Sequence, residues 1–237
     1  RFFVQQRWSI ETFGKLSFTL SISNMFLTFV NAVGIVMFPL LRRTNQQRLP
    51  ELFRVLRDLF VPLTYGLLLF YVPAKIVLTM WLPEYRESLN FMGILFPIVI
   101  YEGRMSLLIN TYLKTLRKEK TILMVNVMTL SFSLVASLVI IFVIGNLNLA
   151  VGLILLSLAF RCNLAEYFLC RGMKLPVGYR QLVETILTIA FIFSNIWFGG
   201  DFISLGIYSL IYVIYLLYVH RSFLASFGEF RLLLKER

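Results

Sequence analysis

Four ionisable residues lie inside long apolar segments of the chain, namely Glu102, Arg104, Arg161 and Glu166. A charge at the centre of a bilayer costs at least about 2.5–3.5 kcal/mol. Such groups can pair across helices and fix the helix register, or they can form a site for an anionic substrate or a protonatable relay. The residue types alone leave both interpretations open.

Helix geometry predicts which of these groups can meet. Glu102 and Arg104 are two residues apart, about 200° around a helix, so they cannot pair with each other. Arg161 and Glu166 are five residues apart, about 140° around, and they also pair poorly. We therefore expect pairs between helices, such as Glu102 with Arg161 or Arg104 with Glu166.

Uncharged polar side chains form a stripe along the first apolar segment. Asn24, Thr28 and Asn31 are spaced by three or four residues, so they share one face of a helix. Small polar faces often pack against other helices in a membrane. Two asparagines and a threonine nevertheless favour a face toward a hydrated cavity. Asn110 lines up with Glu102 on the third segment and joins the candidate site.

The segments that position these residues are long enough to cross a membrane. The chain has 237 residues, of which 59% are hydrophobic and 15% charged, whereas an average domain is about 25% charged. This composition excludes a disordered chain, a disulfide scaffold and an ordinary cytosolic domain. About 20 apolar residues span a bilayer. The sequence thus predicts an all-α polytopic membrane helix bundle with seven transmembrane helices: Leu16–Leu41, Leu59–Leu82, Ser88–Leu113, Thr121–Ile144, Leu149–Cys170, Gln181–Gly199 and Phe202–Val219.

The positive charge is distributed unevenly between the loops. The net charge is +11, from 23 Lys and Arg against 12 Asp and Glu. Most of the basic residues follow the first, third, fifth and seventh segments. Because basic loops mark the cytoplasmic side, we expect the chain to start outside and to end in the cytoplasm. The charge then reflects topology, and no nucleic-acid partner is expected.

Three further charged positions are interpreted as interfacial. Leu49–Phe60 has its apolar side chains on one face, with Arg57 off that face, which predicts a short helix on the membrane surface running into the second span. Lys75 lies near the outer end of its span and is expected to snorkel to the interface. Glu184 is about one turn into the sixth span and is expected near the cytoplasmic surface.

The sequence carries none of the usual catalytic or metal-binding motifs. His220 is the only histidine, and no nucleophile is placed to act with it. Cys162 and Cys170 are eight residues apart, about 12 Å along a helix, which is too far for a disulfide. We expect two buried thiols, no cofactor, no metal and no enzymatic activity.

Several stretches resemble the second half of bacterial polysaccharide flippases. These are "RFFVQ" at the start, "NAVGIVMFPLLRR" at the end of the first span and "LINTYLKTLRKEK" after the third. The family is the Wzx-like oligosaccharide flippase branch of the multidrug/oligosaccharidyl-lipid/polysaccharide exporter superfamily, and the resemblance covers about residues 1–175. It implies the C-terminal lobe of a two-lobed, MATE-like transporter. Residues 1–15 would end a preceding span, 16–171 form the five-helix core of the lobe, 172–222 add two helices and 223–237 form a cytoplasmic tail.

The resemblance also implies a function and roles for the charged residues. A flippase of this family moves an undecaprenyl-diphosphate-linked oligosaccharide, the repeat unit of O-antigen, capsule or exopolysaccharide, to the periplasmic leaflet of the bacterial inner membrane by alternating access. An ion gradient is the expected energy source. Arg104 and Arg161 would meet the diphosphate, and Glu102 and Glu166 would couple the ion. The implied partners are the N-terminal half of the same chain, membrane lipids and the polysaccharide polymerase machinery.

Three alternatives remain at the level of sequence. A drug or cation antiporter of the same superfamily would favour carboxylates in its cavity, and the basic and acidic groups at depth here are balanced. A membrane polysaccharide polymerase or ligase would need a sizeable outer loop, and the outer loops here are short. A purely structural subunit would have little use for ionisable groups at depth.

Overall fold

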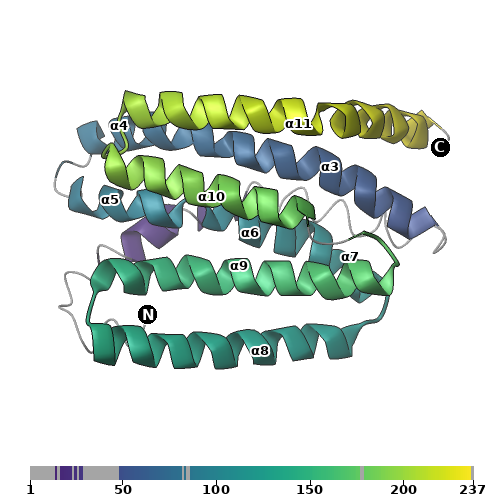
Figure 1. Cartoon of the computed structure of the whole chain (residues 1–237), viewed down its shortest axis with the longest axis horizontal. Helices are drawn as coiled ribbons and strands as arrows, with labels where there is room; N and C mark the ends of the chain where they lie inside the picture. The colour runs from purple at the N-terminus through teal and green to yellow at the C-terminus, as the bar shows by residue number, and fades with distance from the viewer. Residues whose placement is uncertain are drawn as a thin grey trace.

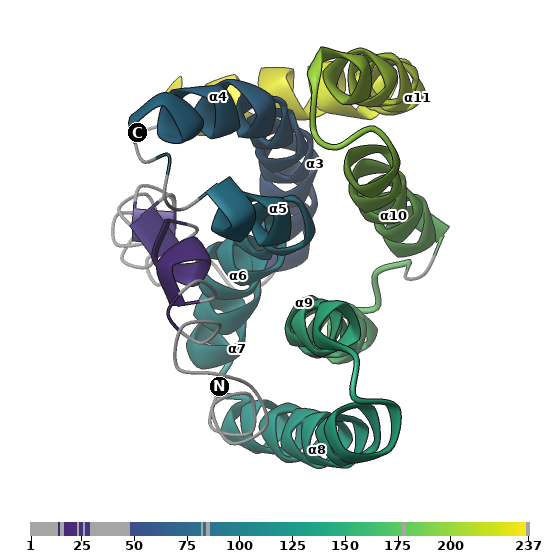
Figure 2. The same cartoon turned by 90° about the vertical axis from the view of Figure 1, so that its left-hand side faces the viewer.

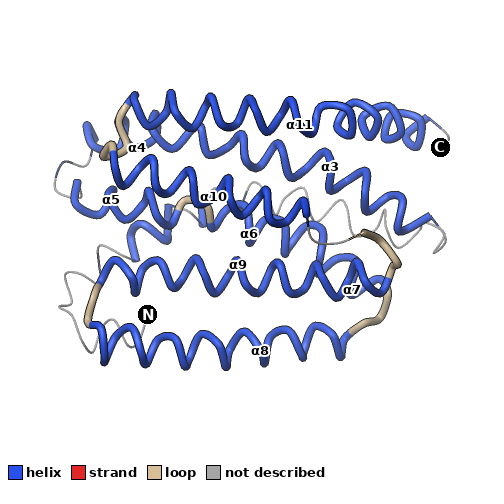
Figure 3. Tube along the Cα trace, viewed as in Figure 1, coloured by secondary structure: helices blue, strands red, loops and turns tan. Residues whose placement is uncertain are grey.

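The computed structural model describes residues 14, 17–22, 24–25, 27–28, 48–81, 83, 86–176 and 179–235, without the side chains of 86–88, 90, 227 and 229–235. Within these residues every regular element is a helix and no strand is present (Figure 3). This confirms the all-α class. Backbone N–H and C=O groups in a bilayer must form hydrogen bonds within the protein, and a helix satisfies them within one segment. The long apolar runs of this chain therefore form helices.

The second expected span begins earlier than the sequence predicted. α3 (Leu49–Leu67), the 3-10 turn η2 (Leu68–Phe70) and α4 (Tyr71–Trp81) form one continuous stretch of 33 residues. Pro50 occupies the first turn of α3, where its missing N–H is not needed. The expected surface helix Leu49–Phe60 is therefore the first part of this 33-residue stretch. Its apolar face packs into the protein, since Leu49 and Phe53 are each only 1% exposed.

The third expected span is a broken rod. It consists of α5 (Arg86–Leu95), α6 (Ile98–Arg104), the π-helical η4 (Met105–Asn110) and α7 (Thr111–Thr115). Pro97 separates α5 from α6, because proline cannot donate a helical hydrogen bond. The π-helical turn begins directly after Arg104. π-turns are uncommon and often mark functional positions.

Two tight turns that contain glycine join α8 to α9 and α10 to α11. α8 (Glu119–Leu138) and η5 (Val139–Ile144) end at Gly145, which adopts a left-handed φ of 68°. Asn146 then caps α9 (Leu147–Gly172), its side chain accepting hydrogen bonds from the amides of the next turn. α10 (Tyr179–Trp197) is followed by Gly199 and Gly200, with φ of 67° and 71°.

The last helix is longer than expected. α11 runs from Phe202 to Lys235, 34 residues, so the segment interpreted as a separate tail from residue 223 continues the helix. The far end of α11 turns aside from the first part of the helix (Figure 2). Tyr208 and Tyr212 on α11 each donate a 2.9 Å hydrogen bond to a backbone carbonyl of α3, at Tyr65 and Pro62. These bonds fix α11 against α3.

The helices form a bundle with two hydrophobic clusters. α8 lies beside α9 on one side, α11 lies beside α3 on the other, and α10 lies between them (Figures 1 and 2). The first cluster joins the start of α3 to α6, α7 and α9, and it includes Leu20 and Leu27 from the N-terminal part. The second joins the end of α3 to α4, α5, α10 and α11.

Five stretches are long and apolar enough to cross a membrane: Leu49–Trp81, Phe91–Thr115, Glu119–Ile144, Leu147–Gly172 and Phe202–Ser226. They correspond to five of the seven expected spans. The sixth expected span, Gln181–Gly199, corresponds to the helix α10. This helix is not one of the five stretches that are long and apolar enough to cross a membrane. Most of the first, Leu16–Leu41, lies outside the described residues.

The surface of α8 is apolar almost all round. In the most apolar part of Glu119–Ile144, which contains α8 and η5, only 11% of the residues are buried inside the protein. The corresponding share for Phe91–Thr115 is 83%. Lipid is the solvent in which such an exposed apolar helix is stable.

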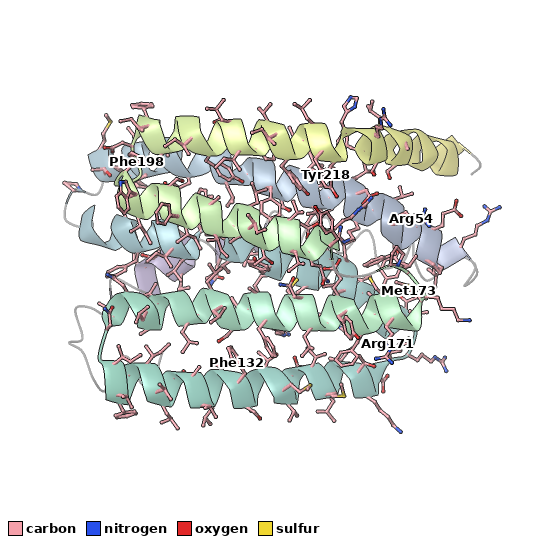
Figure 4. All side chains as sticks on the ribbon, viewed as in Figure 1. Arg54, Phe132, Arg171, Met173, Phe198 and Tyr218 are labelled. Carbon is pink, nitrogen blue, oxygen red and sulfur yellow. The ribbon has the colours of Figure 1, made fainter. Side chains whose placement is uncertain are left out.

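The basic segments gather at one end of the bundle. The start of α3, the junction of α7 with α8 and the end of α9 lie together there, and Arg54 and Arg171 mark this end in Figure 4. The opposite end holds the turn at Gly145 and the loop near Phe198. Lys75 lies at that opposite end, where its ammonium donates to the carbonyl of Gly199. We refer to the first of these as the basic end.

Candidate functional site: a buried charge cluster

Four charged residues from four helices meet inside the bundle. Arg57 comes from α3, Arg104 from α6, Glu166 from α9 and Glu184 from α10. Their exposed fractions are 9%, 1%, 1% and 2%. We call these four residues the charge cluster. Its carboxylates come from helices of different hydrophobic clusters: Glu166 lies next to Ala165 of the first, and Glu184 is three residues before Leu187 of the second.

Each arginine of the charge cluster contacts both carboxylates. Arg57 donates from Nε to Glu166 and from Nη2 to Glu184, the latter at 2.9 Å to Oε1 and 3.1 Å to Oε2. Arg104 donates from Nη1 to Glu184 and, at 3.2 Å, to Oε2 of Glu166. The four formal charges cancel.

A second layer of hydrogen bonds holds Glu184 and its helix in place. The hydroxyl of Tyr65 donates to the backbone carbonyl of Glu184 at 2.7 Å and lies 3.0 Å from the hydroxyl of Thr188. Tyr101 donates to the same threonine at 3.1 Å. The guanidinium of Arg104 lies 5.7 Å from the ring centroid of Tyr101, in cation–π range. These contacts attach α10 to both α3 and α6.

The charge cluster is suited to fixing the helix register. Isolated buried charges are strongly unfavourable, and a pair compensates only when its geometry and remaining hydrogen bonds are satisfied. Here four helices must be in register before all four contacts form. The four charges of the cluster cancel, and only Arg57 and Glu166 reach a cavity. Arg104 and Glu166 are thus paired with opposite charges between helices, and their expected role at a substrate or ion site stays a prediction.

A second ion pair lies at the same depth but is more accessible. Nη1 of Arg161 on α9 is 3.7 Å from Oε1 of Glu102 on α6, and the two side chains are 28% and 30% exposed. Nε of Arg161 is buried without a hydrogen-bond partner among the described residues. Both expected pairings between helices, Glu102 with Arg161 and Arg104 with Glu166, are therefore confirmed.

The polar candidates lie apart from the charge cluster. Asn24 is exposed, and its carbonyl accepts a hydrogen bond from Thr28 at 3.1 Å. Asn110 is half-buried in η4. Asn31 lies outside the described residues.

Two members of the charge cluster lie deeper in the protein than the sequence predicts. Arg57 was expected on the solvent side of a surface helix and Glu184 at the cytoplasmic surface, but both are buried. A signal was present, because Arg57 stands four residues from both Phe53 and Val61, and these two residues belong to the buried core. A charged residue on the same helix face as core residues needs a buried partner. The spacing within one helix does not identify that partner, because the partner lies on another helix.

A cavity of about 440 Å³ adjoins the charge cluster at the basic end. Arg57 and Glu166 reach its inner wall, and Asp58, Arg180 and Tyr218 line it farther out. Arg180 donates from Nη1 to Asp58 and from Nη2, at 3.0 Å, to the hydroxyl of Ser222 on α11. This pair connects α3, α10 and α11 next to the charge cluster.

The chemistry available in this region is ionic and hydrogen-bonding. Across the described part of the chain, no three His, Cys, Asp or Glu side chains are grouped so that they could hold a metal ion. Cys162 and Cys170 are buried free thiols, as expected.

No protein-family model, curated protein or solved structure matches this chain.

Proposed function

We propose that this chain forms the C-terminal lobe of a two-lobed, MATE-like transporter that moves an undecaprenyl-diphosphate-linked oligosaccharide from the cytoplasmic to the periplasmic leaflet of a bacterial inner membrane. The C-terminus lies in the cytoplasm in this proposal, with the basic end. The proposed substrate is based on the resemblance of residues 1–175 to oligosaccharide flippases. The accessible ion pair Glu102–Arg161 is the observation that supports transport.

The position of this pair supports a water-filled path. Glu102 and Arg161 lie near the middle of the apolar stretches Phe91–Thr115 and Leu147–Gly172, yet nearly a third of each side chain is exposed. Ionisable groups at this depth face a polar cavity or another protein element, because lipid cannot solvate them. A face with this pair is suited to a cavity shared with a second lobe.

The pair has the chemistry that a lipid diphosphate requires. A guanidinium binds phosphate oxygens through two parallel N–H groups. Nη1 of Arg161 faces Glu102, and its buried Nε has no hydrogen-bond partner among the described residues. Glu102 balances the charge of Arg161 while no anion is bound. Protonation of Glu102 would free Arg161 from this ion pair. In this proposal Arg161 binds the diphosphate and Glu102 couples the ion. The charge cluster keeps the lobe rigid while it rocks.

Transfer between leaflets tests the proposal. The protein at its natural length is reconstituted into vesicles that contain a polyprenyl-diphosphate saccharide with a fluorescent sugar, and a membrane-impermeant quencher reports the outer leaflet. We expect Arg161→Gln to slow transfer at least about tenfold, the value of one charge-assisted hydrogen bond. Arg171→Gln, an exposed position on the same helix, is the matched control.

Other outcomes would reject the proposal. Transfer no faster than in protein-free vesicles would reject a flippase. Proton-driven movement of a cationic drug without lipid transfer would favour the antiporter. Equal rates for Arg161→Gln and Arg171→Gln would reject the site. A Glu102→Gln variant that still responds to a pH gradient as the unmodified protein does would remove Glu102 from ion coupling.

A further inference from the structure

The cavity at the basic end is a separate site from the accessible pair Glu102–Arg161. It lies between α3, α9, α10 and α11 and has a volume of about 440 Å³. Exposed side chains of Arg54, Tyr179 and Arg180 line it, so it opens to the surface. Figure 4 shows Arg54 and Tyr218 toward the same end of the bundle as Arg171.

The charged groups of the cavity leave hydrogen-bond donors unused. Each carboxylate there already has an arginine, since Asp58 pairs with Arg180 and Glu166 pairs with Arg57. Arg57 bonds through Nε and Nη2, which leaves Nη1 without a partner in the described part of the chain. Nε of Arg180 is left over in the same way. These nitrogens can only donate, so they require an acceptor.

Two further groups add to this surplus of donors. Arg54 lines the cavity and takes part in none of the ion pairs between described residues. The side-chain amide of Gln181 lies beside the carboxylate of Glu166, and its Nε2 is buried without a well-formed hydrogen bond to those residues. A phosphate ester offers several acceptor oxygens and a negative charge, and arginine matches its geometry.

The walls of the cavity indicate a lipid rather than a soluble anion. Phe53, Leu175 and Pro176 form an apolar side. Tyr179 and Tyr218 meet at its edge, with ring centroids 6.5 Å apart. Tyrosines gather where membrane helices meet the headgroup layer. Basic pockets between helix ends at that depth suit anionic headgroups.

We propose that this cavity binds the phosphate ester of an anionic membrane lipid. Arg54, Arg57 and Gln181 hold the phosphate oxygens, and the apolar side receives the glycerol and the first part of an acyl chain. This site is separate from the accessible pair Glu102–Arg161, and it goes beyond the proposed function because it requires no transported substrate. A lipid bound here would join α3, α9, α10 and α11 around the charge cluster.

Lipid binding to the purified protein tests this inference. The protein at its natural length, in a neutral detergent, is titrated with short-chain phosphatidylglycerol and with the diacylglycerol of the same chains, and bound lipid is counted by native mass spectrometry. We expect phosphatidylglycerol to bind and diacylglycerol not to bind. Arg54→Gln should weaken binding about tenfold. Arg171→Gln, at the same basic end but outside the cavity lining, should leave it unchanged.

Further measurements distinguish a lipid phosphate from free phosphate and show whether the variants are folded. Millimolar inorganic phosphate that displaces the lipid at equal concentration would overturn the assignment to a lipid. Equal binding of the two lipids, or equal loss in Arg54→Gln and Arg171→Gln, would overturn the site. Arg54 is exposed and outside the charge cluster, so its variant should melt at the temperature of the unmodified protein. Gln181→Leu should also weaken binding, since it removes the buried donor.

Discussion

Removing one carboxylate from the charge cluster should destabilise the protein far more than removing one from the accessible pair. Glu184→Gln keeps the shape of the side chain and removes its charge. Arg57 and Arg104 would then share Glu166 alone, which leaves one uncompensated positive charge among side chains that are 10% exposed or less. Breaking a buried ion pair in this way costs about 3–5 kcal/mol.

The accessible pair supplies the matched control. Glu102→Gln removes the same charge by the same chemistry, but this carboxylate is 30% exposed and lies 3.7 Å from its arginine. Pairs of this exposure contribute about 0–1 kcal/mol. The two variants should thus differ by at least about 2 kcal/mol in the free energy of unfolding.

A double variant separates charge balance from loss of packing. Arg57→Met together with Glu184→Gln leaves Arg104 and Glu166 as a neutral buried pair. We expect its cost to fall short of the sum of the two single costs by about 2 kcal/mol, within the range found for residues that share one network. Unfolding in mixed micelles, followed by far-UV circular dichroism, gives the free energies of unfolding of the unmodified protein, the two single variants and the double variant.

Two results would refute this reasoning. If Glu184→Gln were no more destabilising than Glu102→Gln, the charge cluster would not be acting as a buried network. If the double variant cost the full sum of the single variants, the contacts would be independent. The first result would also remove the basis for treating the lobe as rigid.

The glycines and Cys162 give further tests. A Cβ at Gly66 would lie 2.8 Å from the hydroxyl of Tyr212, whereas a Cβ at Gly206 would have no heavy atom within 4 Å. Gly66→Ala should therefore lower the melting temperature. Gly206→Ala should leave the melting temperature unchanged or raise it, because alanine favours a helix over glycine by about 1 kcal/mol. The reverse order would contradict the close packing of α11 on α3. Cys162 is buried and lies outside the cavity lining, so it should react with a maleimide slowly in the folded protein and fast in sodium dodecyl sulfate. Rapid labelling of Cys162 before unfolding would show that its surroundings are open.

The apolar pattern determined much of the fold. Long uncharged runs require helices in a bilayer, and the turns at Gly145 and Gly199 follow from glycine, the residue that most readily adopts a positive φ. The two pairings between helices also followed from the sequence. Residues 102 and 104, like 161 and 166, cannot face each other on one helix, so each charge had to seek a partner elsewhere.

The charge cluster needed the tertiary structure. Arg57 and Glu184 lie near the ends of their apolar segments, where a charge normally reaches water by itself. Only the packing of α3 and α10 against α6 and α9 buries them, and a fourfold contact among residues 57, 104, 166 and 184 is not encoded in any local spacing. The cavity beside them likewise depends on four helices meeting at one end.

The sequence by itself thus determined that this is a bundle of apolar helices and that charges at depth must pair between helices. Both follow from the cost of exposing backbone polar groups or charge to lipid, which acts on each segment separately. Tertiary structure decided which charges are sealed inside and which remain accessible. Arg104 pairs inside a closed, neutral cluster and Arg161 pairs at an accessible surface, because that difference depends on the neighbouring helices and not on the helix that carries the residue.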